Sequence, residues 1–95
     1  MWPPYATAGA YVLSRKSFTD MYYAMLYTKL FRFDDVFLGL AALKANIKLL
    51  HCPHVYFEKK YYSLEGYRDV VASHGYGDPS ELTSVWNEQK NAGRA

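Results

Sequence analysis

The stretch "FRFDDVFLGLAALKANI", residues 31–47, places two adjacent carboxylates in front of an apolar run. From Asp35 onward, apolar residues recur at helical spacing, which predicts an amphipathic helix. The residues expected roughly on its apolar face are Val36, Leu40, Leu43 and Ile47. Asn46 suits the left-handed backbone that commonly ends a helix, so we expect the helix to stop there.

The acidic pair Asp34–Asp35 allows two interpretations. Asp is favoured at an N-cap and in the first turn, where the positive end of the helix dipole stabilises a carboxylate. Two neighbouring carboxylates also repel each other, and this raises their affinity for protons unless a cation, water or the dipole compensates. A carboxylate at a helix start that opens onto a cleft can act as a general base or bind substrate hydroxyls. The pattern favours the first interpretation and predicts Asp34 as the N-cap, and it leaves the chemical role open as the alternative.

Before this helix, the chain predicts a strand and another helix. "AGAYVL", residues 8–13, is typical of a short strand, and it contains Gly9, where backbone can approach closely. Ser14 is a good N-cap, and the apolar spacing that follows predicts a helix to about Tyr27.

After the central helix, three segments are typical of short strands. "IKLL" (47–50) and "HVYF" (54–57) lie on either side of a predicted turn at Cys52-Pro53. "YRDVVASH" (67–74) predicts a third strand, which ends on a histidine.

The last predicted helix begins with Asp78 as N-cap, Pro79 at the first helical position and Glu81 at the third. Its expected apolar face consists of Leu82, Val85 and Trp86. Because strands alternate with helices along the chain, the predicted fold class is α/β.

Composition limits the possible functions. The chain has 95 residues, so it forms at most one domain and is short enough to be part of one. Hydrophobic residues make up 51% and aromatic residues 18%, which indicates either a compact aromatic core or surface that packs on something else. A net charge of +2 does not favour nucleic-acid binding. The longest apolar run is well short of the roughly 18 residues that a membrane-spanning helix needs.

Three further groups of side chains contain residue types that could carry chemistry. His74 ends a predicted strand beside a glycine-rich loop, where an imidazole is either a surface residue or a metal ligand. "HCPH", residues 51–54, is too short for known zinc spacings, so we interpret it as a turn. Tyr5, Trp2 and the tyrosines of "KKYYSLEGY", residues 59–67, have rings that are able to stack on sugars.

Three segments together resemble the β-1,3-glycosyltransferases of glycosyltransferase family 31. "WPPYATAGAYVLS" is similar to the family's Y-P-P-Y-x-x-G-x-G-Y-V-x-S stretch, and "FRFDDVFLGLAALKANI" to its E-D-V-Y-x-G-x-C-L-x-K-L-G-I block. "YRDVVASHGYGDPSELTSVWN" is similar to its closing H-x-x-x-P-x-E-M-x-x-x-W pattern. Order and spacing agree, and the resemblance covers nearly the whole chain.

This resemblance implies a GT-A type fold, a mixed sheet flanked by helices, of which residues 1–95 would be the C-terminal portion. The D-x-D motif, which carries the metal and the diphosphate, would lie upstream in the N-terminal half of the domain. The resemblance also implies a UDP-sugar donor, inversion at the anomeric carbon and a divalent metal, Mn²⁺. It further implies a type II Golgi membrane protein with a lumenal catalytic domain and a signal anchor ahead of this chain.

The site residues follow from the same resemblance. The family's catalytic Asp falls on Asp35, and its neighbouring Glu is Asp34 here, a shorter acid for binding acceptor hydroxyls. The metal-binding His of the closing motif falls on His74. The glycine-rich strand that binds substrate falls on residues 8–10 around Gly9, with Ala replacing a family Gly, and Tyr5 precedes it.

Within the family, the central and closing segments are most similar to an insect enzyme that transfers N-acetylglucosamine onto mannose of a glycosphingolipid core. The expected function is therefore transfer of N-acetylglucosamine from a UDP-sugar to the 3-hydroxyl of a glycolipid or glycoprotein glycan. Transfer of galactose is one alternative. The other is a non-catalytic interaction module, which predicts that no D-x-D precedes the chain.

Overall fold

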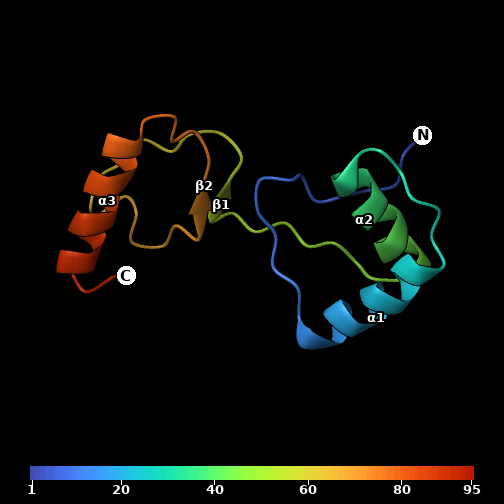
Figure 1. Ribbon diagram of the computed structural model, residues 1–95. Coiled ribbons are helices and arrows are strands. Elements are labelled where there is room, and N and C mark those ends of the chain that lie inside the picture. The colour runs from blue at the N-terminus through green and yellow to red at the C-terminus, as the bar shows by residue number, and fades with distance from the viewer. The chain divides into compact units, whose positions relative to one another are not determined.

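Three helices and two very short strands make up the computed structural model, which describes all of residues 1–95 (Figure 1). In chain order the elements are α1 (Arg15–Leu26), α2 (Asp34–Lys44), β1 (Val55–Tyr56), β2 (Ala72–Ser73) and α3 (Pro79–Asn91). They divide between two compact units, Met1–His51 and Cys52–Ala95, and each unit is described separately below. None of the helices has both the length and the apolar character needed to cross a membrane.

The starts of α1 and α3 are as predicted, because short-range capping signals set them. Ser14 is the N-cap of α1, and its Oγ accepts a hydrogen bond from the Ser17 N–H at 3.1 Å. Asp78 is the N-cap of α3, and its Oδ1 accepts from the Ser80 N–H at 2.8 Å, with Pro79 at the first helical position.

The end of α2 is also set locally. Asn46 has a φ of 56°, the left-handed conformation expected there. Its N–H donates to the Leu43 carbonyl at 3.1 Å, and the Ile47 N–H donates to the Ala42 carbonyl at 2.8 Å. These two bonds form the Schellman arrangement, which satisfies carbonyls that the helix end would otherwise leave free.

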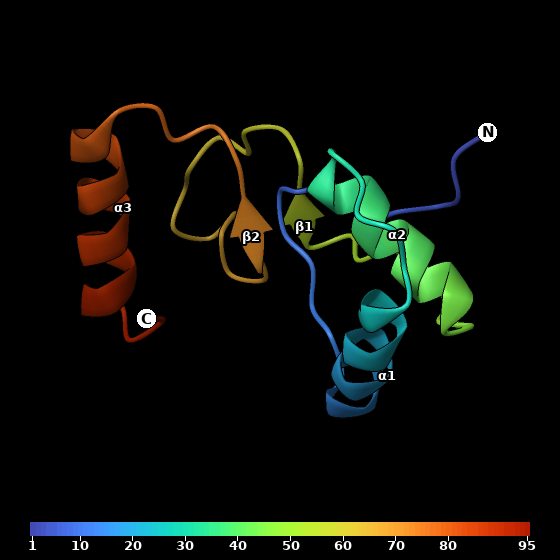
Figure 2. The same cartoon turned by 45° about the vertical axis from the view of Figure 1, so that its right-hand side comes forward.

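The first unit is held together by α1 packed against α2, which lie side by side in Figures 1 and 2. Met21 and Ala24 of α1 meet Ala41 and Ala42 of α2, and Ala41 is fully buried. The small side chains of the three alanines allow the two helix backbones to approach closely. The residues packed around this cluster are Leu38, Ala45 and Ile47.

The predicted apolar face of α2 was only partly correct. Val36 is 2% exposed and Ile47 packs on the core, but Leu43 is 63% exposed. The alanines at 41 and 42 take the position against α1, which turns Leu43 outward. Helical spacing identified an amphipathic helix but not which stripe its neighbour would cover.

Gly39 of α2 provides a direct test of how the N-terminal segment packs. A Cβ added there would lie 2.6 Å from the Tyr5 Cβ and 3.0 Å from the Pro4 carbonyl oxygen. We therefore expect the clash in Gly39→Ala to cost the full-length protein about 1–3 kcal/mol of stability. The better helix propensity of Ala offsets ~1 kcal/mol of this cost. The free energy of unfolding in urea measures this change.

Gly77 supplies the matched control, since a Cβ there would meet nothing within 4 Å. Gly77→Ala should change the free energy of unfolding by no more than about 0.5 kcal/mol. If Gly39→Ala were equally neutral or stabilising, the described contact between α2 and the N-terminal segment would be wrong.

The second unit has one parallel strand pair, in which Val55 lies opposite Ala72 and Tyr56 opposite Ser73. None of its side chains is fully buried, and α3 buries none of its own residues. The apolar face predicted for α3 is therefore open, with Leu82 half exposed. Polar contacts join the elements of this unit instead of an apolar core.

Several strand predictions were wrong. Residues 8–13 contain a turn and irregular chain, and 47–50 form no strand. Only two residues each of 54–57 and 67–74 pair. A strand needs a neighbour for its backbone hydrogen bonds, and these segments have no further partner within the chain. The observed fold is thus helix-rich with a small parallel sheet, smaller than the mixed sheet expected for a whole α/β domain.

Candidate functional site

The acidic pair begins α2, but neither acid is the N-cap. Phe33 occupies that position and makes no side-chain capping bond, so the prediction that Asp34 caps the helix was wrong. Both acids lie inside the first turn. The Asp34 Oδ1 accepts from the Asp35 N–H at 2.9 Å, and the Asp35 Oδ1 accepts from the Val36 N–H at 2.8 Å. They therefore satisfy the free N–H groups of the helix start without being its cap.

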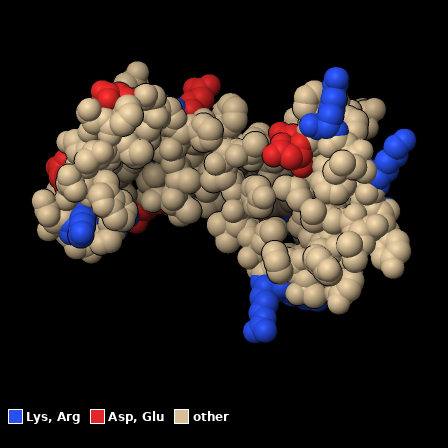
Figure 3. Space-filling view, viewed as in Figure 1, with Lys and Arg blue, Asp and Glu red and all other residues tan.

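The two carboxylates differ in their surroundings. Asp34 is exposed, whereas Asp35 is half-buried and is followed by the buried Val36. Acidic side chains form a patch over the start of α2 in the space-filling view (Figure 3). One Asp35 oxygen is held by backbone, and its Oδ2 has no partner within the chain. A carboxylate mounted in this way can accept a proton or bind a hydroxyl.

The predicted residues of the N-terminal segment lie in the same unit as the acids. Tyr5 is adjacent to Gly39, which is one helical turn after Asp35 and hence on the same side of α2. Tyr5 is therefore placed along the helix face that carries Asp35. Gly9 lies in a turn instead of a strand.

The structure also contains an aromatic cluster of Trp2, Phe31 and Phe33, which the sequence did not predict. The Trp2 ring centroid lies 6.0 Å from that of Phe31 and 5.8 Å from that of Phe33, and the two phenylalanines are 5.8 Å apart. The Arg32 guanidinium lies 4.6 Å from the Phe33 ring centroid. The alternation Phe-Arg-Phe in the sequence indicated that two rings could lie on one side. Only the folded structure shows that Trp2 contacts both of them.

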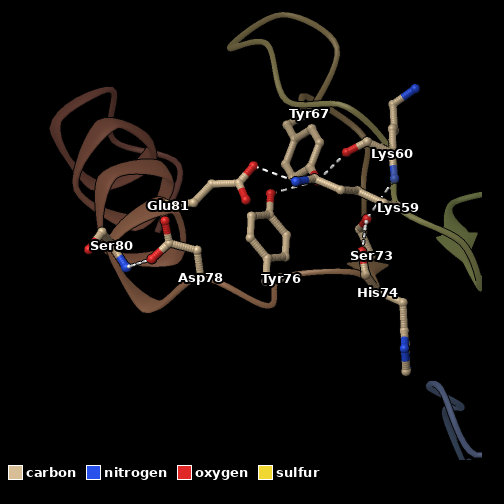
Figure 4. Close-up of polar contacts among 9 residues, drawn as sticks. All are labelled: Lys59, Lys60, Tyr67, Ser73, His74, Tyr76, Asp78, Ser80 and Glu81. Carbon is tan, nitrogen blue, oxygen red and sulfur yellow. Dashed lines mark hydrogen bonds and ion pairs between the residues drawn. The ribbon is translucent and has the colours of Figure 1, made fainter.

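His74 belongs to the second unit. Its N–H donates to the Tyr56 carbonyl at 3.2 Å, so the strand pair fixes its backbone. The imidazole is exposed and stacks on Phe57, with ring centroids 5.9 Å apart and 26° between the planes. Figure 4 shows this imidazole pointing away from the polar contacts around Tyr67 and Tyr76.

These polar contacts tie together the segments on either side of His74 (Figure 4). Tyr76 donates to the Tyr67 hydroxyl at 2.7 Å, and Tyr67 donates to the Lys60 carbonyl at 2.8 Å. The Lys60 N–H donates to the Ser73 Oγ at 3.0 Å, which links the same segment to β2. His74 is thereby held between two anchored neighbours, Ser73 and Tyr76.

An ion pair and a glycine complete the arrangement. Lys59 Nζ lies 2.6 Å from Glu81 Oε1 in the first turn of α3, and this hydrogen bond raises the pKa of Lys59. Gly75 has a φ of 92°, and a Cβ there would lie 2.5 Å from the Lys59 Cβ. Only glycine fits this turn between His74 and Tyr76 without strain.

The hydroxyl of Tyr76 predicts an effect of alkaline pH. Burial, and then the hydrogen bond with Tyr67, raise the pKa of Tyr76 above its ordinary value of about 10. Above that value the unfolded chain loses a proton that the folded chain retains, so stability falls as pH rises from about 10 towards the raised pKa. The Tyr76→Phe variant has no hydroxyl that can ionise, so its stability does not fall with pH for this reason. It also lacks the hydrogen bond to Tyr67, which is worth about 1 kcal/mol.

We therefore expect Tyr76→Phe to have a lower free energy of unfolding than wild type at pH 8. This difference in the free energy of unfolding should become smaller between pH 9 and 11. Urea unfolding of the full-length protein at each pH measures this. If the difference in the free energy of unfolding stays constant or grows with pH, the Tyr76 hydroxyl does not have the raised pKa and the hydrogen bond to Tyr67. Tyr61→Phe, at an exposed ring without a described hydrogen bond, is the control.

The chain alone supplies no complete metal site. No three side chains of His, Cys, Asp or Glu lie close enough together to hold an ion. Residues 51–54 form a turn, closed by the Val55 N–H donating to the Cys52 carbonyl at 3.2 Å, as interpreted from the sequence. The exposed imidazole of His74 is able to provide one ligand, and further ligands would have to come from outside these residues.

Comparison with known proteins decides the family. A family model described as galactosyltransferase matches residues 1–53. The Drosophila melanogaster protein named beta-1,3-galactosyltransferase brn (brainiac) is 50% identical over 95 residues, which is 99% of this chain and 29% of that protein. The chain belongs to the galactosyltransferase family.

Other galactosyltransferase relatives are more distant. Beta-1,3-galactosyltransferase bre-5 of Caenorhabditis elegans is 34% identical over 76 residues, covering 79% of this chain and 24% of that protein. Mouse beta-1,3-galactosyltransferase 1 is 29% identical over 90 residues, covering 95% of this chain and 27% of that protein. The chain thus spans less than a third of each of these galactosyltransferases, and no solved structure matches it.

The comparisons confirm the family resemblance found in the sequence. They also agree with its more specific part, because brainiac is the insect enzyme to which the central and closing segments were judged most similar. Brainiac carries the word galactosyltransferase in its name, whereas the resemblance of the central and closing segments implies transfer of N-acetylglucosamine.

Proposed function

We propose that residues 1–95 are the C-terminal part of the GT-A type catalytic domain of an inverting β-1,3-glycosyltransferase. The observation that carries the proposal is the Asp35 carboxylate, fixed by the Val36 N–H at the start of α2 with its other oxygen free. Family membership and relatives named as β-1,3-galactosyltransferases support this chemistry. The nucleotide-binding D-x-D motif would lie in the part of the domain upstream of this chain.

In the proposed reaction, Asp35 accepts the proton of the acceptor's 3-hydroxyl. The acceptor oxygen forms a bond to C1 of the donor sugar while the bond from C1 to the UDP oxygen breaks, and that electron pair leaves with the diphosphate. Attack from the face opposite UDP inverts the anomeric carbon. A sugar hydroxyl is a much weaker acid than a carboxylic acid, so the proton must move late, as the new bond forms.

The neighbouring residues position the substrates. Asp34 is exposed beside the base, where its free oxygen would bind another acceptor hydroxyl. Tyr5 lies along the same side of α2 and would contact the sugar, and the Gly9 turn would pass close to the substrate. These roles keep the reacting hydroxyl oriented, which is where most of the advantage of a bound acceptor arises.

His74 would provide one ligand to a divalent metal, Mn²⁺, which the upstream D-x-D would complete. When bound, this metal would neutralise charge on the departing diphosphate. The contribution of this chain would be to fix the backbone of His74 through the Tyr56 carbonyl and to stack the imidazole on Phe57.

We propose N-acetylglucosamine as the transferred sugar and a glycolipid or glycoprotein glycan as acceptor, on the resemblance of the central and closing segments. Galactose is the second candidate, because the printed names of the relatives specify it. The expected location is the Golgi lumen, with a membrane anchor ahead of this chain.

A donor screen tests this function. The full-length protein is incubated with Mn²⁺, a mixed panel of glycan acceptors and either UDP-N-acetylglucosamine or UDP-galactose. Transfer from UDP-N-acetylglucosamine is expected. Transfer from UDP-galactose only would show that the transferred sugar is galactose and would leave the proposed reaction unchanged. No transfer from either donor, together with no D-x-D upstream, would favour a non-catalytic interaction module.

A further inference from the structure

The aromatic cluster of Trp2, Phe31 and Phe33 is not part of the hydrophobic core. The α1–α2 core consists of other residues, and none of the three rings packs in it. Trp2 is 54% exposed and Phe33 is 41% exposed. Leaving so much aromatic surface in water sacrifices the favourable free energy of burying it, so a concentrated exposed cluster indicates a surface that binds something.

The contacts among the rings leave the Trp2 side chain half exposed. Trp2 and Phe31 meet at 75° and the two phenylalanines at 63°, both edge-to-face. An edge-to-face contact covers one face of one ring and only an edge of the other. The Arg32 guanidinium lies over the Phe33 ring, so the more exposed Trp2 ring is the one against which a flat ligand could lie.

The cluster adjoins the two carboxylates. Phe33 is the N-cap residue of α2, so it immediately precedes Asp34 and Asp35 in the chain. The Arg32 guanidinium, 4.6 Å from the Phe33 ring centroid, adds hydrogen-bond donors at the same place. One small surface thus offers aromatic faces, carboxylate acceptors and guanidinium donors.

This combination matches the chemistry of a neutral pyranose ring. Such a ring has a face of C–H groups, which carry slight positive charge and are attracted to the negative face of an aromatic ring. It also has a rim of hydroxyls, which donate to carboxylates and accept from guanidinium groups. Hydrophobic walls with a few placed polar groups are typical of small-ligand sites.

We propose that the aromatic cluster is an acceptor subsite, on which a pyranose ring of the acceptor glycan stacks while its hydroxyls bind Asp34 and Arg32. The proposal rests on the proposed function, and it assigns to Trp2, Phe31 and Phe33 the recognition of the acceptor sugar. Stacking there places the sugar beside Asp35, because Phe33 and the acids share the start of α2.

The test uses the full-length protein and three separate acceptors, the methyl β-glycosides of mannose, galactose and N-acetylglucosamine. For the acceptor that is used best, Trp2→Ala should raise the acceptor KM at least tenfold and leave the UDP-sugar KM unchanged. Trp2→Leu should raise the acceptor KM similarly, because it keeps apolar bulk but has no aromatic face. Trp2→Phe should retain most of the affinity.

Trp86→Ala is the matched control, since Trp86 is also half exposed, at 55%, but lies on α3. It should not change the acceptor KM. An acceptor KM within twofold of wild type for a folded Trp2→Leu protein would overturn the subsite. Loss of the folded state in Trp2→Leu would overturn it too, because the ring would then be packing against protein.

Direct binding separates this proposal from the proposed function. Saturation-transfer NMR measures contact between each methyl glycoside and the protein without turnover. If wild type transfers sugar while Trp2→Leu binds the acceptor normally, the subsite is wrong and the function stands. If wild type binds a glycoside in a Trp2-dependent way but transfers no sugar, the function is wrong and the pyranose-binding site stands.

Discussion

Asp35→Asn in the full-length protein is expected to lower kcat by about 10²–10⁴-fold, the usual contribution of a general base. Asparagine keeps an oxygen that can still accept from the Val36 N–H, so the helix start should persist. It cannot take the proton from the acceptor hydroxyl. Loss of one negative charge near the helix dipole costs about 0.3–1 kcal/mol, too little to unfold the protein.

The measurement is kcat with saturating acceptor and donor, accompanied by donor binding and a thermal melt. Donor binding should remain, since Asp35 acts on the acceptor. Asp34→Asn is the matched control, an exposed acid one residue earlier with the same kind of backbone bond. It should raise the acceptor KM more than it lowers kcat. Near-normal turnover of Asp35→Asn would rule out its role as base.

His74→Ala is expected to have the second-largest effect, on metal dependence. Losing one ligand should raise the Mn²⁺ concentration for half-maximal activity at least tenfold, as loss of support at metal sites typically costs about 10–100-fold. The backbone should be unaffected, because the N–H of residue 74 still donates to the Tyr56 carbonyl. A titration of activity against Mn²⁺ after removal of bound metal measures this shift.

His54→Ala provides the control for removing an exposed imidazole from the same unit. Its Mn²⁺ titration should coincide with wild type. An unchanged titration for His74→Ala would eliminate the ligand assignment and leave His74 as a surface residue stacked on Phe57.

The sequence predicted those parts of the fold that depend on neighbouring residues. Ser14 and Asp78 begin helices because their side chains reach N–H groups two or three residues away. Asn46 ends α2 because its own backbone adopts a positive φ. These signals act within one turn of the chain and need no knowledge of the rest of the molecule.

Longer-range features were not predictable in this way. Residues 8–13 have strand-forming composition, yet they have no pairing partner within the chain and do not form a strand. Leu43 fits the helical spacing, but the small alanines beside it pack on α1 and leave it exposed. Phe33 became the N-cap of α2 although Asp34 was the better candidate by composition.

The candidate site divides in the same manner. Asp34, Asp35 and His74 came from matching ordered motifs, and the structure adds how each is held. The aromatic cluster could not be assembled from the sequence, because it joins residue 2 to residues 31 and 33. The Tyr67–Tyr76 bond likewise depends on a fold that returns the chain onto itself.

We propose that this chain belongs to an enzyme that builds a β-1,3 linkage with Asp35 as base. The most direct measurement is NMR analysis of the product that the full-length protein makes from a UDP-sugar and its best glycan acceptor. The account predicts a new sugar in β configuration on the 3-hydroxyl, absent when Asp35→Asn replaces wild type. A product with α configuration, linkage to another hydroxyl, or undiminished product from Asp35→Asn would contradict it.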